Sequence, residues 1–303
     1  MNIRKSNKSD ISGWLNINKE SNISSAKVVA IVKKLTGAKK AGHAGTLDPM
    51  ATGVLPIALG AATKTVRFVM NGIKQYEFEV KWGAETDTDD IEGNIIKKSS
   101  KRPTSEEIIK SINKFTGEIV QVPPKYSAIK VNGVRSYKIA RKFGNPILKS
   151  RKIYVKKLEL LKYIDSDSSK FFLECEKGVY VRSIARDLAQ YLGTNGHVSK
   201  LCRLSVNKFY YKDAILLADL SKLVDKSVII ESIMPISRVL DDIPAFEIDK
   251  VNATKISNGQ KIYFNNDYLE GKNKLEEIFI TYKNNPMAIA RYENGVISPK
   301  KVF

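Results

Sequence analysis

Residues 42–57 read Gly-His-Ala-Gly-Thr-Leu-Asp-Pro-Met-Ala-Thr-Gly-Val-Leu-Pro-Ile. This stretch is too rich in glycine and proline for a helix or a strand core, so we expect residues 42–56 to form a structured loop. Such a loop can bring its backbone close to a ligand, and this one presents an imidazole, His43, and a carboxylate, Asp48. Because an aspartate before proline is most often a turn residue, the loop alone does not decide whether Asp48 is catalytic.

The segments around this loop show both helical and strand patterns. Residues 24–35 and 104–117 carry apolar side chains at helical spacing, and each begins with a side chain suited to cap a helix. Residues 75–82 alternate between apolar and polar side chains, which predicts a half-buried strand. Residues 171–177 predict another strand, which leads directly into a helix at residues 181–192. These patterns favour an α+β fold with a largely antiparallel mixed sheet and flanking helices.

The last sixty or so residues have a different, strand-rich character. Turn signals at residues 284–286 and 294–295 separate three apolar runs. The short strands are expected at residues 279–282, 287–292 and 296–303. We therefore predict two domains, a larger one over residues 1–243 and a small β-rich one over residues 244–303.

Composition and charge exclude several classes of protein. The chain has 303 residues, of which 43% are hydrophobic and 27% charged, as in a folded globular protein. Its 51 Lys and Arg against 32 Asp and Glu give a net charge of +19, which favours a polyanionic partner. Neither a membrane span nor an apolar signal core is evident, so we expect a cytoplasmic protein. The two cysteines, Cys175 and Cys202, are isolated, and with His43 and His197 they lack the spacing of a metal site.

The positive charge is concentrated in one segment. Residues 119–158 contain no acidic residue and 11 basic ones. Tyr126 and Tyr137 lie among these charges, a mixture that suits binding to an RNA backbone and to unstacked bases. The alternative is a lysine-rich solvated surface without a specific partner. Because the charges repel one another and apolar residues are few, we expect this segment to be poorly ordered without RNA.

The loop at residues 42–57 resembles the signature of the bacterial tRNA pseudouridine synthase B family. Further blocks that resemble this family follow in the same order along the chain. They are residues 122–133, 137–141 and 178–188. At the C-terminus, residues 258–260 and 301–303 resemble the small RNA-binding PUA domain. The resemblance supports the α+β fold and places the active site in a cleft across the sheet, with residues 119–158 as an RNA clamp.

The resemblance implies a reaction that needs no cofactor and no metal: isomerisation of uridine 55 in the TΨC arm of tRNA to pseudouridine. Asp48 corresponds to the nucleophile, and Arg182 to the arginine that pairs with it. Tyr76, which on pattern alone is a core aromatic residue, corresponds to the tyrosine that stacks on the uracil and can accept its C5 proton. Tyr180 corresponds to a pocket residue beside the base.

Two further positions of the family concern RNA contacts around the flipped base. His43 corresponds to the residue that fills the gap left by the uridine, and Leu201 to a leucine that packs on the uracil face. The family usually continues this leucine with two arginines and a threonine, whereas this chain has Cys202, Arg203 and Leu204. The candidates for RNA backbone contacts are Lys125, Lys130, Arg135, Lys138 and Arg141.

We expect tRNA to be the partner, with no membrane, no obligate protein partner and a monomeric state. Three alternatives stay open from the sequence. The chain could remodel tRNA without catalysis, modify RNA with a guide RNA and partner proteins, or hydrolyse a substrate with Asp48 and His43.

Overall fold

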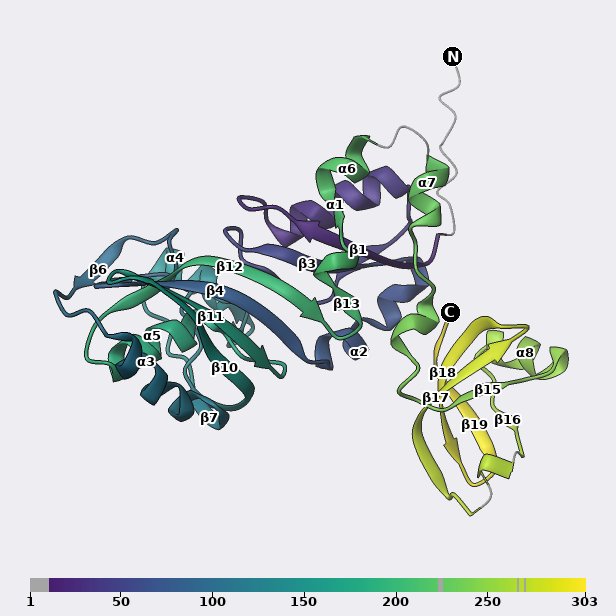
Figure 1. The fold of residues 1–303 in the computed structure, drawn as a ribbon. Coiled ribbons are helices and arrows are strands. Elements are labelled where there is room, and N and C mark those ends of the chain that lie inside the picture. Colours follow the sequence, from purple (N-terminus) through teal and green to yellow (C-terminus); the bar gives the residue numbers. More distant parts are fainter. Residues whose placement is uncertain (1–10, 223–225, 266, 270) are drawn as a thin grey trace.

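The structure is a computed structural model that describes residues 11–222, 226–265, 267–269 and 271–303. One ten-stranded sheet, one five-stranded sheet and two short two-stranded sheets make up its strands. The elongated part of the molecule contains the ten-stranded sheet, and the part nearer the C-terminus contains the five-stranded one (Figure 1).

The ten-stranded sheet is the main element of the elongated part of the molecule (Figure 1). Its strands are β1 (Gly13–Lys19), β2 (Ala41–His43), β3 (Thr52–Leu59), β4 (Lys74–Trp82), β7 (Gly117–Gln121), β10 (Arg151–Asp165), β11 (Ser168–Cys175), β12 (Gly196–Val206), β13 (Phe209–Tyr210) and β14 (Ile215–Leu216). Eight of them follow in the order β14-β1-β3-β12-β4-β11-β10-β7, with β2 on β3 and β13 on β12. Among the described pairings of this sheet, β1 with β14 and β3 with β12 are the parallel ones. The α+β fold with a largely antiparallel mixed sheet is therefore confirmed.

Eight helices are described, of which α8 packs on the five-stranded sheet and the others belong to the part with the ten-stranded sheet. The eight are α1 (Ser25–Thr36), α2 (Val66–Asn71), α3 (Ser105–Ile112), α4 (Ser136–Phe143), α5 (Val181–Tyr191), α6 (Leu217–Lys222), α7 (Lys226–Glu231) and α8 (Lys250–Ser257). Short 3₁₀ turns lie at Gly60–Lys64, Asn113–Phe115, Tyr211–Asp213, Ile236–Val239 and Asp267–Leu269. Ser24 caps α1, and Thr104 and Glu107 form the predicted capping box of α3. α3 ends earlier than predicted, because its last turn before Gly117 tightens into a 3₁₀ helix.

The two faces of β4 differ as its alternation predicts. Phe78, Val80 and Trp82 belong to the same buried cluster as apolar residues of α5, which packs against β4 and β12. On the opposite face, Glu77 and Glu79 pair with lysines of the neighbouring strands β11 and β12. This pattern fixes which face of the sheet the helices cover.

The acid-free segment is only partly an insertion into the fold. Residues 117–121 and 151–165 are β7 and β10 of the ten-stranded sheet, where apolar side chains such as Ile153 and Val155 are buried between exposed lysines. Residues 122–150 leave the sheet and contain α4 and the small hairpin of β8 (Lys130–Val131) and β9 (Val134–Arg135). The expected disorder of this segment without RNA stays a prediction, which protease resistance with and without tRNA would test.

The strand-rich C-terminal region is confirmed as a five-stranded sheet. Its strands are β15 (Ala245–Glu247), β16 (Ile262–Tyr263), β17 (Lys274–Tyr282), β18 (Asn285–Glu293) and β19 (Val296–Val302), in the order β15-β17-β18-β19-β16. The turn at Asn294 and Gly295, both with positive φ, is the predicted one. The other predicted turn is shifted: Lys283 and Asn284 form it, and Pro286 lies within β18.

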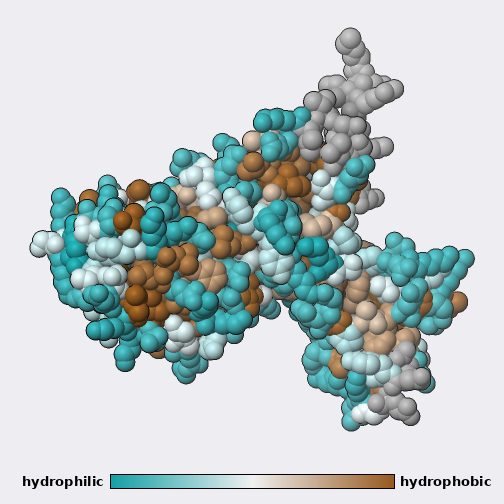
Figure 2. All heavy atoms as spheres, viewed as in Figure 1, coloured by the Kyte–Doolittle hydropathy of each residue, from teal (hydrophilic) through white to brown (hydrophobic). Residues whose placement is uncertain are grey.

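The two sheets are joined by a shared apolar cluster. Phe279 of β17 and Ile289 of β18 pack with Trp14 of β1 and with Phe209 of β13. Figure 2 shows hydrophilic residues over much of the visible face of the molecule, interrupted by apolar patches. The domain division at residue 243 stays a prediction, although every strand of the five-stranded sheet follows it. One further small hairpin, of β5 (Ala84–Thr86) and β6 (Ile95–Lys98), lies beside the site described next.

Candidate active site

The glycine-rich motif is a turn between two strands and not a loop throughout. β2 ends at His43 and β3 begins at Thr52, so the expected loop is wrong for the second half of the motif. β3 is a central strand between β1 and β12, with Val54, Leu55 and Ile57 buried, and this burial outweighs the unfavourable Pro56. The turn between β2 and β3 carries Asp48.

Contacts from β1 and α1 fix this turn. The hydroxyl of Ser25 accepts from the backbone N–H of Leu47 and donates to its carbonyl, both at 2.9 Å. The ammonium of the buried Lys19 donates to the carbonyl of Pro49 at 2.9 Å. These hydrogen bonds fix the backbone of Leu47 and Pro49 on both sides of Asp48. They therefore restrict where the Asp48 side chain can lie.

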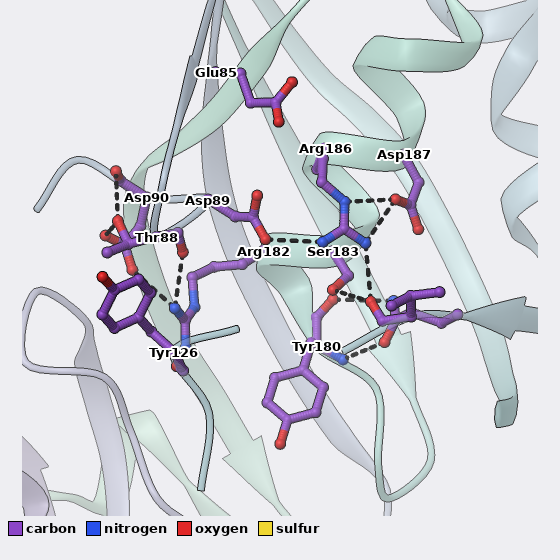
Figure 3. Close-up of polar contacts among 12 residues, drawn as sticks. Glu85, Thr88, Asp89, Asp90, Tyr126, Tyr180, Arg182, Ser183, Arg186 and Asp187 are labelled. Atoms are coloured by element: carbon purple, nitrogen blue, oxygen red, sulfur yellow. Dashed lines mark hydrogen bonds and ion pairs between the residues drawn. The ribbon is translucent and has the colours of Figure 1, made fainter. Parts of the chain in front are cut away.

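Arg182 of α5 connects Asp48 with other segments of the chain. Its Nη2 donates to the carboxylate of Asp48 at 2.9 Å and to the carbonyl of Tyr126 at 3.0 Å. Its Nη1 donates to the carbonyl of Thr88 at 2.9 Å and lies 3.2 Å from the carboxylate of Asp90. Figure 3 shows the guanidinium pointing between Thr88 and Tyr126. The structure therefore brings together the predicted pair of Asp48 and Arg182.

Burial sets the electrostatics of this pair. The side chain of Arg182 is 4% exposed, whereas that of Asp48 is 29% exposed and can be reached from the cavity described below. Burial raises the pKa of Asp48, and the charge of Arg182 opposes this rise. An arginine bound on one oxygen keeps the carboxylate oriented while leaving part of it accessible.

Sequence reasoning missed Asp90. It lies in the connection between β5 and β6, and its side chain also accepts from the hydroxyl of Thr88 at 2.7 Å. The preceding Asp89 binds Arg186, one turn after Arg182 on α5, at 2.9 Å (Figure 3). The acidic run at residues 87–90 could have indicated a partner for Arg182. The sequence alone, however, does not show which of its carboxylates faces α5.

The Asp48 carboxylate faces a cavity of about 830 Å³. The sequence-predicted site residues that line it are Asp48, Tyr76, Arg141, Tyr180, Arg182 and Leu201. Those that do not line it are His43, Lys125, Lys130, Arg135 and Lys138. The cavity also has Asp87, Asp90 and Glu92 in its lining, and the basic Arg151. Two of its basic residues, Arg141 and Arg151, come from the acid-free segment.

Tyr76 lies on β4, directly across from Arg203 of β12. Burial raises the pKa of Tyr76 to about 12, and the charge and hydrogen bond of Arg203 act against this rise. The phenol is therefore protonated near neutral pH, and only 7% of the residue is exposed. This geometry suits a ring that packs against a base.

Tyr180 precedes α5, and its ring is packed against Arg151. The guanidinium carbon of Arg151 lies 5.1 Å from the ring centroid, and one of its N–H groups donates to the carbonyl of Gly178. The side chain of Gln121 accepts from the backbone N–H of Tyr180 at 2.9 Å. Arg151 was counted among the basic residues of the segment but not among the site candidates, because its partner Tyr180 is distant in the sequence.

His43 is half-buried at the end of β2, behind the Asp48 turn. Burial lowers the pKa of His43, and the charge of Arg203 lowers it further, so the imidazole is neutral near physiological pH. Its Nδ1 is buried without a hydrogen-bond partner among the described residues.

The remaining basic candidates lie on the part of the acid-free segment outside the sheet. Lys130 and Arg135 pair across the β8–β9 hairpin, and Lys138 and Arg141 are on α4. The hydroxyl of Ser136 donates to the carbonyl of Lys125 at 2.5 Å, which ties the start of α4 to the preceding loop. Of these cations, Arg141 lines the cavity, as do Tyr126, Ile129 and Tyr137 of the same segment.

Comparison with known proteins identifies the family. A family model described as TruB family pseudouridylate synthase (N terminal domain) matches residues 33–181, and one described as tRNA pseudouridylate synthase B C-terminal domain matches residues 182–241. The chain belongs to the tRNA pseudouridine synthase B family. As in this family, it is an isomerase that makes pseudouridine in tRNA. This decides against a non-catalytic protein and against a hydrolase.

Relatives in the tRNA pseudouridine synthase B family match nearly the whole chain. The tRNA pseudouridine synthase B of Bradyrhizobium diazoefficiens is 42% identical over 302 residues, which cover 97% of this chain and 86% of the relative. That of Ehrlichia ruminantium is 46% identical over 294 residues, which cover 96% and 99%. The sequence-based resemblance is therefore confirmed.

Solved structures share the fold. A chain of a Cbf5-Nop10-Gar1 complex has a TM-score of 0.70 at 23% identity, covering 96% of this chain and 84% of that one. A chain of an H/ACA RNP bound to a substrate RNA containing 2′-deoxyuridine has a TM-score of 0.69 at 21% identity, covering 96% and 84%. At these identities the likeness concerns the fold alone.

Two features of the described residues concern metal binding and membranes. No group of three or more His, Cys, Asp and Glu side chains in the described ranges could hold a metal ion. No helix in the same ranges is long and apolar enough to span a membrane. The cytoplasmic location stays a prediction.

The departure from the family at Cys202 lies away from the cavity of Asp48. Cys202 pairs with Glu77 across the β12–β4 ladder, while Arg203 pairs with Tyr76. Neighbouring residues of a strand point to opposite faces. Cys202 lines a separate hollow with Glu77 and Lys170. The cation usual in the family is thus missing on the face opposite Arg203.

Proposed function

We propose that the chain isomerises uridine 55 in the TΨC arm of tRNA to pseudouridine, with Asp48 as the nucleophile and without cofactor or metal. The contacts of Asp48 carry the proposal. One oxygen is bound by the buried Arg182, and the exposed part of the side chain faces a cavity of about 830 Å³, which has room for a flipped nucleotide. A buried carboxylate beside an arginine is the arrangement expected of an anion kept ionised for chemistry.

The reaction exchanges one bond for another within the nucleotide. The bond between N1 of uracil and C1′ of ribose breaks, and a bond between C5 and C1′ forms. C5 then loses its proton and N1 gains one, so substrate and product are isomers. Asp48 attacks C1′ of the sugar or C6 of the uracil to permit rotation of the base, and it leaves when the new bond has formed.

The uridine has to leave the stack of the tRNA elbow before it can reach Asp48. Tyr76 packs against the flipped base, with Tyr180 and Leu201 on other sides of the cavity. The high pKa of Tyr76, raised to about 12 by burial, makes ring packing its main role and proton acceptance a minor one. His43, neutral because burial lowers its pKa, fills the vacated place in the tRNA.

Basic residues of the acid-free segment bind the RNA backbone. Lys125, Lys130, Arg135, Lys138 and Arg141 form the clamp on one side of the bound TΨC arm. The C-terminal sheet acts as a PUA-like RNA-binding domain. The protein works as a monomer and needs no guide RNA or protein partner.

A tritium-release assay tests the proposal. Wild type and Asp48→Asn are incubated with an unmodified tRNA transcript labelled at uridine C5, without metal or guide RNA. We expect release by wild type only, with equal tRNA binding by both proteins. A second transcript with cytidine in place of uridine 55 should abolish release at that site. Release by Asp48→Asn would refute the nucleophile, and no release by wild type would favour a guide-dependent enzyme.

A further inference from the structure

Arg203 of β12 is bound to both ends of the turn that carries Asp48. Its Nε donates to the carbonyl of Val54 at 2.8 Å, and its Nη2 donates to the carbonyl of Gly45 at 3.0 Å. Its Nη1 lies 3.5 Å from the carbonyl of Thr46. One side chain therefore connects the segment before Asp48 with the strand after it.

The surroundings of Arg203 are unusual for an arginine. The residue is 2% exposed, and among the described residues no carboxylate forms an ion pair with it. A buried cation without an ionic partner is unfavourable, and burial lowers the pKa of Arg203 accordingly. An apolar side chain of similar volume would avoid the cost of burying this charge, but it would leave the carbonyls of Gly45 and Val54 without their donor. The charge is therefore linked to the geometry of the Asp48 turn.

The phenol of Tyr76 is the polar side chain that Arg203 reaches. The two residues are direct cross-strand neighbours on β4 and β12, so their side chains lie on the same face of the sheet. Burial raises the pKa of Tyr76, and the charge of Arg203 opposes this rise. A cation that donates to the phenol oxygen fixes the direction of the hydroxyl and the plane of the ring. The same guanidinium thus contacts the Asp48 turn and the Tyr76 side chain.

We propose that Arg203 is a positioning residue for pseudouridine formation, which holds the Asp48 turn and the Tyr76 ring in one fixed geometry. The inference rests on the proposed roles of Asp48 and Tyr76. It accounts for the buried unpaired charge, because a planar group with several donors can bind three carbonyls of the Asp48 turn and of β3 while its guanidinium faces the phenol of Tyr76. A lysine at this position would keep the charge but lose most of this network.

Lys19 provides a matched control within the same site. It is also a buried cation bound to backbone carbonyls, at Glu20, Ile23 and Pro49, and burial lowers its pKa to about 8. It holds the Asp48 turn from the side of β1. None of its described hydrogen bonds reaches Tyr76. If Arg203 acted on the Asp48 turn alone, its substitution should therefore have the same kind of effect as substitution of Lys19.

The test combines single-turnover tritium release with tRNA binding for Arg203→Lys, Arg203→Met and Lys19→Met. We expect Arg203→Met to lower the rate by about 100-fold or more, with tRNA affinity changed by less than about threefold. Arg203→Lys should retain an intermediate rate. In a Tyr76→Phe background, the loss caused by Arg203→Lys should shrink at least tenfold, whereas the loss caused by Lys19→Met should not change.

A second measurement reports the environment of Tyr76 directly. It requires neither an active enzyme nor the Arg203→Met variant. The ¹⁹F resonance of fluorotyrosine placed at position 76 should shift in Arg203→Lys and stay unchanged in Lys19→Met. An unchanged resonance, additive losses in the double mutants, or a rate loss explained by weaker tRNA binding would each overturn the proposal. If Asp48→Asn is active, the proposed function fails instead, and this result is independent of Arg203.

Discussion

The carboxylate of Asp90 lies 3.2 Å from Nη1 of Arg182, whose Nη2 binds Asp48 at 2.9 Å. Two carboxylates therefore share one buried guanidinium. The side chain of Asp90 is only 3% exposed, so this ion pair is buried. Its negative charge also raises the pKa of Asp48. Asp90 thus orients the arginine and at the same time opposes ionisation of Asp48.

Asp90→Asn should lower the single-turnover rate by about 10- to 100-fold, because Arg182 loses a buried ionic partner that helps to orient its guanidinium toward Asp48. tRNA affinity should stay unchanged. Asp87→Asn is the control, since Asp87 also lines the cavity but accepts from the backbone N–H of Asn94 and does not contact Arg182. Equal losses in both variants would show that the effect comes from general charge at the cavity.

The pH dependence of the reaction reports the ionisation of Asp48. Burial raises its pKa, so kcat/KM should fall on the acidic side as Asp48 takes up a proton. Arg182 lowers this pKa, and Arg182→Lys removes a planar donor from the carboxylate. The acidic limb should therefore move to higher pH in Arg182→Lys. A lower rate with an unshifted limb would contradict a role of Arg182 in keeping Asp48 ionised.

Local patterns in the sequence predicted much of the fold. The alternation of β4, the cap of α1 and the capping box of α3 all depend on residues close together in the chain. Predictions failed where tertiary contacts override such patterns. β3 is a strand despite Pro56, because the sheet buries it. The acid-free segment contributes to β7 and β10, and in β10 the exposed lysines conceal the buried apolar residues.

The site could be predicted only in part for the same reason. Asp48 and Arg182 are 134 residues apart, so the resemblance to the family, and no local pattern, paired them. Asp90 and Arg151 were missed because their contacts depend on the packing of α5 and on the sheet. Arg203 could not be distinguished from a surface arginine, since only the register of β12 against β4 shows that it faces Tyr76.

Arg151→Met should weaken tRNA binding more than it lowers the rate. Arg151 packs on the ring of Tyr180 and lines the cavity, and among the described residues it forms no ion pair, so it can meet an RNA phosphate. We expect about a tenfold higher Kd, from the loss of a phosphate contact and of a cation–π contact of about 0.5–1 kcal/mol. Lys152→Met is the control, because Lys152 is exposed and pairs with Glu118. An equal increase of Kd in both variants would indicate that the loss of one positive charge, and not the position of Arg151, weakens tRNA binding.

Cys202→Arg should keep activity within about twofold of wild type, since substitutions away from a site usually change energies by less than 0.5 kcal/mol. Cys202 lines the hollow with Glu77 and Lys170 and is absent from the lining of the Asp48 cavity. An arginine here can pair with Glu77. Initial rates of tritium release with saturating tRNA would measure the effect. Complete loss of activity would show that β12 is registered differently from the corresponding strand of the family.

Gly53→Ala should destabilise the protein and reduce its activity. Gly53 has a φ of +99°, and a Cβ on it would lie 2.3 Å from the backbone oxygen of Arg203. The strained conformation alone costs about 1–3 kcal/mol, and separating β3 from β12 would also displace the Asp48 turn from Leu201. Gly42→Ala is the matched control, since no atom lies within 4 Å of its Cβ position. Urea unfolding should give a lower midpoint for Gly53→Ala only, and equal midpoints would contradict the close approach of the two strands.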